Sequence, residues 1–80
     1  MKITECFFTA HARDRMRDRN ISAEEVRLVL SNPEMIYPGM KGETNSMRII
    51  KGRNIRVVFM DEEPKRIITV MVVGRPGETK

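Results

Sequence analysis

Apolar residues are sparse between Thr9 and Asn20, where the pattern predicts a short helix over residues 10–19. Thr9 is a favourable N-cap for this helix. Ala12 and Met16 form a narrow apolar stripe, so the helix would cover a core with one edge only. Asn20 tolerates the left-handed conformation that ends helices, and it marks the expected C-terminus.

A second, more amphipathic helix is predicted over residues 23–31. Ser22 and Glu25 have the spacing of a capping box, in which each side chain bonds the other residue's backbone N–H. The apolar positions that follow are spaced at i, i+3 and i+4: Val26, Val29 and Leu30. Pro33 disfavours helical geometry in the residue before it, so the helix ends by Asn32.

The remainder of the chain has the pattern of extended strands separated by short turns. We expect strands at 35–37, 47–51, 55–60 and 66–73. The two turns that join the last three strands are Gly52-Arg53-Asn54 and the segment 61–65. Such short connections imply antiparallel neighbours. The apolar segment 3–8 is either a strand or a hydrophobic staple under the first helix.

This order of elements predicts one α+β domain over residues 1–80, with a polar tail from 74. Both helices would pack on one face of a small antiparallel sheet of three to four strands. Within 55–60, Ile55, Val57 and Phe59 point one way and form the expected core face. Arg56 would point to the opposite, more open face, and Arg48 would join it there if the register allows.

Composition and charge narrow the classes of function that are open to this chain. The chain has 80 residues, a net charge of +4 and a pI near 9.7, which favours nucleic acid or an acidic protein as partner. No apolar run approaches the ~20 residues of a membrane span. Cys6 is the only cysteine, so the default location is a reducing cytoplasm. With one histidine and one cysteine we expect no metal site, and no glycine-rich loop points to a cofactor.

The most distinctive segment is 11–19, which holds the only histidine, four arginines and two aspartates. On a helix His11, Arg15 and Arg19 fall at i, i+4 and i+8 and form one cationic ridge. An imidazole beside guanidinium groups suits proton transfer and phosphate binding. The alternative is a solvated helix face in which the arginines pair with nearby carboxylates.

A second basic group lies on the predicted hairpin: Arg48, Lys51, Arg53 and Arg56. With Tyr37 as a ring on which a base can stack, these residues have the composition of a nucleic-acid-binding surface. The alternative is that the cations only protect exposed strands from pairing with other chains.

A longer motif runs through the helical region as His11-Ala12-x-x-Arg15-Met16-x-x-Arg19-x-Ile21, preceded by Phe8-Thr9. Asn32-Pro33 and Arg56-Val57-Val58 follow at the expected places. This pattern resembles a family of short prokaryotic proteins described as a domain of unknown function. That family is remotely similar to RelE-like toxins, within the barnase–EndoU–colicin–RelE group of metal-independent ribonucleases.

The resemblance implies cleavage of RNA by attack of the 2′-hydroxyl on the adjacent phosphate. His11 would transfer protons, and Arg15, Arg19 or Arg56 would stabilise charge on the phosphate oxygens. An acidic, antitoxin-like protein would then cover the basic face. Two other hypotheses remain: a non-catalytic module that binds nucleic acid or an acidic protein, and a structural role in which the ridge is solubilising charge. If Arg56 lies on the far face from the helix, the ridge and Arg56 cannot share one site.

Overall fold

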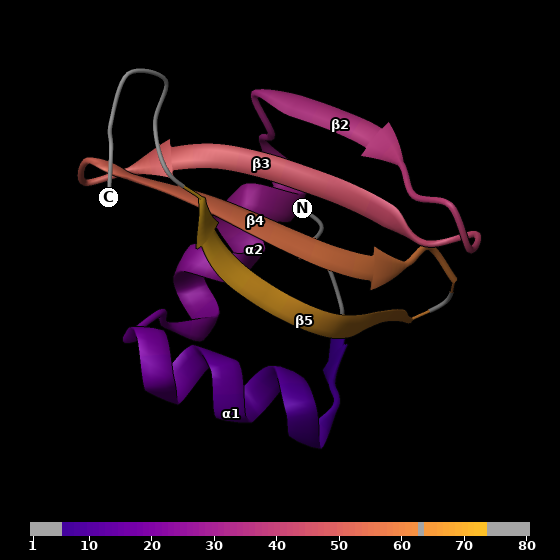
Figure 1. The fold of residues 1–80 in the computed structure, drawn as a ribbon, viewed down its shortest axis with the longest axis horizontal. Helices are drawn as coiled ribbons and strands as arrows, with labels where there is room; N and C mark the ends of the chain where they lie inside the picture. Colours follow the sequence, from indigo (N-terminus) through magenta and orange to yellow (C-terminus); the bar gives the residue numbers. More distant parts are fainter. Residues whose placement is uncertain (1–5, 63, 74–80) are drawn as a thin grey trace.

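The computed structural model describes residues 6–62 and 64–73. Its elements, in chain order, are β1 (Cys6–Phe8), α1 (Ala10–Arg19), α2 (Ala23–Ser31), β2 (Met35–Pro38), β3 (Thr44–Ile50), β4 (Arg53–Met60) and β5 (Lys65–Val73). The five strands form one sheet in the order β1-β5-β4-β3-β2. The α+β class is therefore confirmed (Figure 1).

The sheet is larger than expected, and it is mixed rather than antiparallel. The segment before α1 forms a strand, β1, which pairs in parallel with β5. The other neighbours are antiparallel, as the short turns require. The parallel pair joins segments that are far apart in sequence, so no local turn pattern predicts it. Part of the apolar segment 3–8 and all of the tail 74–80 lie outside the described residues.

Local capping explains why the two helices begin and end where they do. The Thr9 hydroxyl accepts from the Ala12 N–H at 3.1 Å, and Asn20 ends α1 in the left-handed conformation with φ 55°. In α2, the Ser22 hydroxyl accepts from the Glu25 N–H at 3.1 Å, and the Glu25 carboxylate accepts from the Ser22 N–H at 2.9 Å. The capping box is complete, and both helices have the expected bounds.

The core lies between the helices and one face of the sheet. Ile55, Val57 and Phe59 of β4 are at most 2% exposed and point toward the helices, as the alternation predicts. Buried residues of both helices and of β5 complete this core, among them Ala12, Val26, Val29, Ile67 and Val70. Both helices therefore cover the same face. No helix in the described ranges is long and apolar enough to cross a membrane.

Strand bounds and one turn differ from the sequence-based prediction. The hairpin between β3 and β4 turns at Lys51 and Gly52, which both have positive φ, and Ile50 pairs with Arg53. The predicted turn Gly52-Arg53-Asn54 is wrong by one to two residues. Two consecutive residues with positive φ give a turn whose twist matches that of an antiparallel hairpin. This turn, rather than apolar alternation, therefore sets the register of β3.

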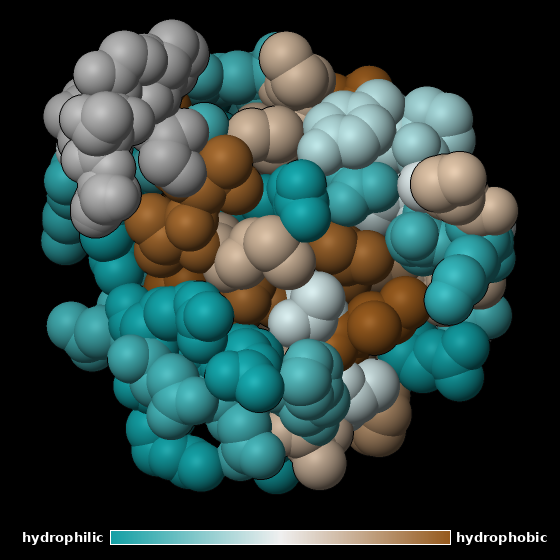
Figure 2. Space-filling view, in the orientation of Figure 1, coloured by the Kyte–Doolittle hydropathy of each residue, from teal (hydrophilic) through white to brown (hydrophobic). Residues whose placement is uncertain are grey.

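The face of the sheet opposite the helices is covered by none of the described helices, and we call it the open face. Figure 1 looks onto this face, with α2 behind the strands and α1 beside β5. Hydrophobic side chains gather in its middle, and hydrophilic ones cover α1 along one border (Figure 2). By strand register, the open face includes Met35, Tyr37, Met47, Arg56, Val58 and Met71.

Candidate functional site

Arg56 lies at the centre of the open face. It pairs in register with Met47 of β3 and Met71 of β5, and its neighbours Ile55 and Val57 point into the core. Its Nη1 donates to the Tyr37 hydroxyl at 3.2 Å, and its Nη2 donates to Met71 Sδ at 3.0 Å. The Arg56 Nε is buried and has no hydrogen-bond partner. Thioethers are weak acceptors, so this guanidinium keeps unused donor capacity.

Unlike the other partly buried arginines of the sheet, Arg56 has no ion-pair partner among the described residues. Arg48 lies 3.7 Å from Glu34, and Arg53 lies 3.3 Å from Glu25. In the part of the chain that the structure describes, no carboxylate lies within ion-pair distance of Arg56. A partly buried cation without a counter-ion favours binding of an anion, because Nη1 and Nη2 each keep a second N–H for charge-assisted bonds, whereas the buried Nε stays out of reach.

Tyr37 brings a second polar group to the same place from the edge strand β2. It pairs in register with Asn45, a polar residue only 7% exposed on the open face. Because the phenol oxygen accepts from Arg56, the O–H proton remains available to another acceptor. The Arg56–Tyr37 pair can therefore donate to an anion from two side chains. Among the described residues, no group of His, Cys, Asp and Glu is arranged to hold a metal ion.

The ridge on α1 does not converge with Arg56. His11 and Arg19 are exposed, and Arg15 pairs with Asp18 at 3.4 Å. Helix α1 packs on β5 and β1, whereas Arg56 lies on β4, the next strand inward. The four residues named for one catalytic site therefore belong to two separate places, and a single phosphate does not reach both.

The basic group on the β3–β4 hairpin is divided between the two faces of the sheet. Arg48 pairs in register with the core residue Ile55, so it lies on the helix side and not beside Arg56. Its Nη1 donates to the Asn32 carbonyl at 3.0 Å, just after α2. The physical reason is the turn at Lys51-Gly52, which fixes a register that turns even-numbered residues of β3 toward the helices.

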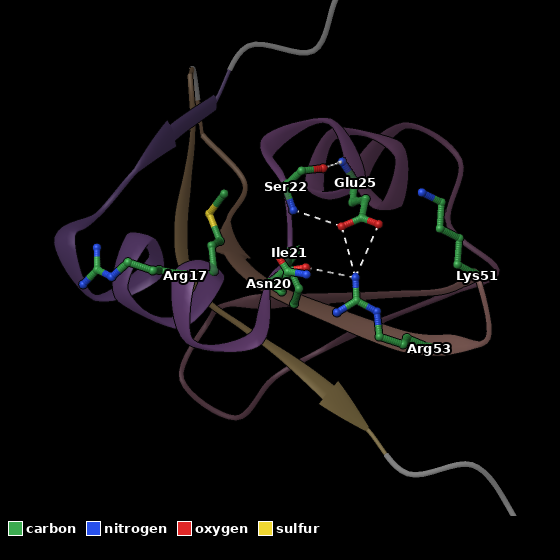
Figure 3. A pocket seen from close by; sticks show the side chains of 8 residues that line it. Arg17, Asn20, Ile21, Ser22, Glu25, Lys51 and Arg53 are labelled. Atoms are coloured by element: carbon green, nitrogen blue, oxygen red, sulfur yellow. Dashed lines mark hydrogen bonds and ion pairs between the residues drawn. The ribbon is translucent and has the colours of Figure 1, made fainter.

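Arg53 also serves the helix side, at a shallow hollow between the two helices and the hairpin (Figure 3). It donates to the carbonyls of Arg19 at 2.7 Å and Asn20 at 3.1 Å, which end α1. It also pairs with Glu25, whose pKa is lowered first by the hydrogen bond from the Ser22 backbone and then by the charges of Arg53 and Lys51, against the opposing effect of burial. This arrangement joins elements together and leaves Arg53 little capacity for a ligand.

Two residues at the Arg56–Tyr37 pair are not predicted by the sequence: Met71, which accepts from Arg56, and Asn45, which pairs in register with Tyr37. Their position depends on pairing across strands, and a single methionine or asparagine in a strand gives no sequence signal for it. Cys6, the only thiol, lies in β1 and is partly buried. Burial raises the pKa of this thiol, although the nearby Arg27 guanidinium opposes the rise, so the thiolate is disfavoured near neutral pH.

Comparison with known proteins adds one finding to this geometry. Residues 8–72 match the model of a family described as "Domain of unknown function (DUF4258)". The matched range contains every residue of the open face and of the ridge named above. No curated protein and no solved structure matches the chain.

Proposed function

This chain belongs to the DUF4258 family of domains of unknown function, and we propose that it is a RelE-like, metal-independent endoribonuclease. In this proposal the substrate phosphate lies on the open face of the sheet, against Arg56 and Tyr37. The observation that carries the proposal is the state of Arg56: it is partly buried, bonded to a phenol, and without an ion-pair partner among residues 6–62 and 64–73.

The chemistry follows from the donors present. The 2′-hydroxyl of RNA attacks the adjacent phosphorus, the bond to the 5′-oxygen breaks, and the products are a 2′,3′-cyclic phosphate and a 5′-hydroxyl. Arg56 would stabilise the negative charge that develops on the phosphate oxygens. Tyr37, whose oxygen already accepts from Arg56, would donate its proton to the departing 5′-oxygen, while water takes up the proton of the 2′-hydroxyl.

Within this proposal His11 does not act on the scissile phosphate, because β5 lies between α1 and Arg56. This differs from the role that the family resemblance implies for it. The toxin-type assignment also implies an acidic, antitoxin-like partner, and the unpaired charge of Arg56 is where such a partner would supply a carboxylate.

Binding of RNA without cleavage is the second candidate. One observation favours it: the only titratable group hydrogen-bonded to Arg56 in the described part is the Tyr37 phenol, so no imidazole or carboxylate stands ready as a general base. A sheet face with a tyrosine and a free arginine can still hold a base and a phosphate.

The test is incubation of the folded protein with single-stranded RNA in EDTA, with analysis of the product ends. We expect 2′,3′-cyclic phosphate ends, and a loss of about 10²–10³-fold in rate for Arg56→Gln, the range found when one donor to a developing oxyanion is removed. Arg66→Gln is the matched control, because this arginine is exposed on β5 and already pairs with Glu62. His11→Ala should retain the cleavage rate at saturating RNA.

Absence of cleavage by folded wild-type protein would overturn the endoribonuclease. If Arg56→Gln then still weakened RNA binding and Arg66→Gln did not, the second candidate would stand. Equal cleavage by wild type and Arg56→Gln would show that the open face is not the site.

A further inference from the structure

The cationic ridge on α1, formed by His11, Arg15 and Arg19, has no part in the proposed reaction. Successive members are four residues apart, so they follow each other at intervals of about 6 Å along the helix axis. This interval is comparable to the separation between neighbouring phosphates of a single nucleic-acid strand. The ridge therefore has the spacing of a surface that binds a nucleic-acid backbone. Its side chains do not converge on one point, as those of a catalytic site would.

The ridge occupies a defined side of α1. Ala12 is fully buried against the sheet, and Met16, Arg17 and Asn20 line the hollow toward α2. At 100° per residue, Arg15 and Arg19 lie on the other side of Ala12 from Arg17, and thus away from the hollow. The ridge consequently runs along the flank of α1 that faces away from α2, where no other described helix packs.

Helix α1 packs on the face opposite the open face, and this flank lies beside the border of the sheet that β5 forms. Helix α1 contacts β5, and β5 pairs directly with the strand that carries Arg56. Viewed onto the open face, α1 runs beside β5, and its hydrophilic side chains border the hydrophobic surface of the strands (Figures 1 and 2). A polynucleotide that has one phosphate at Arg56 reaches the ridge by crossing β5 and the edge of the sheet beside it.

The side chains of the ridge are accessible. His11 and Arg19 are exposed, and no ion pair involves either of them within the described ranges. Arg15 forms only a loose pair with Asp18, at 3.4 Å, with 39% of the arginine side chain and 55% of the aspartate side chain exposed. Exposed pairs of this kind contribute little, so a phosphate can replace the aspartate at small cost.

We infer that this ridge is a second RNA-binding site, which holds backbone phosphates of the strand whose scissile phosphate lies at Arg56. The inferred path of the RNA, from Arg56 toward α1, rests on the proposed function, which places the scissile phosphate at Arg56. The RNA footprint then extends from β4 across β5 to α1, and it requires a substrate several nucleotides long. Short oligonucleotides bind at Arg56 alone, and longer ones gain affinity from the ridge.

The test uses fluorescein-labelled 2′-O-methyl oligouridines of about 4 and about 12 nucleotides, lengths within the range that one small domain binds. The 2′-O-methyl group prevents cleavage, so binding is read separately from catalysis. Affinity is measured by fluorescence anisotropy over a series of salt concentrations. The ridge variant is Arg15→Gln/Arg19→Gln, and the matched control is Arg13→Gln/Arg17→Gln, which removes the same charge from the other side of α1.

For the longer oligonucleotide we expect the ridge variant to bind about tenfold more weakly and to lose about 1.4 from the slope of log K against log salt, since each phosphate contact contributes about 0.7. The shorter oligonucleotide should bind the ridge variant and wild type alike. The control variant should resemble wild type with both lengths. Equal losses in the ridge and control variants, or equal losses with both lengths, would overturn the inference.

Arg56→Gln separates this inference from the proposed function. If Arg56→Gln weakens binding of both lengths and the ridge variant changes neither, the second site is wrong and the proposed site stands. If Arg56→Gln changes neither length while the ridge variant weakens the longer one, the site at Arg56 is wrong and the ridge is confirmed as an RNA-binding surface. Circular dichroism of each variant verifies that it is folded.

Discussion

At the scale of single residues, Arg53 stabilises the junction between the helices and the sheet. Its guanidinium satisfies two carbonyls at the end of α1, from Arg19 and Asn20, which would otherwise lack protein donors. We expect Arg53→Ala to lower the free energy of unfolding by about 1 kcal/mol, because hydrogen bonds from a charged donor contribute about 1.5–3 kcal/mol and exposure of these two bonds to solvent reduces that contribution. Urea denaturation measures this loss.

Arg66→Ala is the control for that prediction. Arg66 forms an exposed pair with Glu62, in which both side chains are about half exposed, so its loss should cost at most about 0.5 kcal/mol. Similar losses in the two variants would show that the carbonyls at the end of α1 gain nothing from Arg53.

Glu25 makes stability depend on pH at the same junction. Its pKa in the folded protein lies below the ordinary value of 4.5, chiefly because the Ser22 backbone N–H donates to the carboxylate. A lowered pKa in the folded state means that this stabilisation is present above pH 4.5 and is lost as the pH falls through the lowered pKa. Glu25→Gln should therefore flatten the decline of stability in acid, measured by urea denaturation between neutral and acidic pH. An unchanged acid profile in this variant would contradict the assignment.

At the scale of elements, the hairpin between β3 and β4 depends on one glycine. Gly52 has φ 82°, and a Cβ added there would meet no atom within 4 Å. Gly52→Ala would therefore introduce backbone strain without a clash, and we expect it to lower the free energy of unfolding by about 1 kcal/mol. Thermal unfolding measures this loss. A variant as stable as wild type would show that the turn readily changes conformation.

The same hairpin shows which features the sequence predicts and which it does not. Capping acts within four residues, so Thr9, Asn20 and the Ser22–Glu25 pair predict both helices with their bounds. Alternation in β4 likewise predicts that Arg56 points away from the core. The position of Arg48 depends on whether the turn falls at Lys51 or at Arg53, and a glycine between two cations is compatible with either.

The placement of the candidate site residues likewise depends partly on local patterns and partly on contacts between distant segments. A helical period places His11, Arg15 and Arg19 on one ridge. Their separation from Arg56 has two causes: Arg56 points to the face opposite the helices, and α1 packs on β5 rather than on β4. Alternation in β4 predicts the first cause, whereas the strand order arises from contacts between distant parts of the chain, so no pattern of spacing predicts the second.

At the scale of the whole molecule, Thr9 connects the beginning of the domain to its last strand. Its hydroxyl donates to the Ile67 carbonyl at 2.9 Å and accepts from the Ala12 N–H, so it bonds β5 while it caps α1. We expect Thr9→Val to lower the free energy of unfolding by about 2 kcal/mol, because both the cap and a long-range bond are lost. Thr9→Ser keeps the hydroxyl and should lose less than about 1 kcal/mol. Urea denaturation compares the two.

If Thr9→Val and Thr9→Ser were equally unstable, the methyl group rather than the hydroxyl would be the important part of this residue. Equal stability of Thr9→Val and wild type would show that neither bond of the hydroxyl contributes.

The strand order also constrains when this domain can fold during its synthesis. Because β5 separates β1 from β4, the first described strand has no neighbour in the sheet until residues 65–67 exist. A nascent chain that has left the ribosome only as far as β4 has its helices and a β2–β3–β4 meander, but Ile67 and Val70 are missing from its core. Folding should therefore be delayed until translation of the domain is nearly complete, and Arg56 would acquire its neighbour Met71 only at that late step.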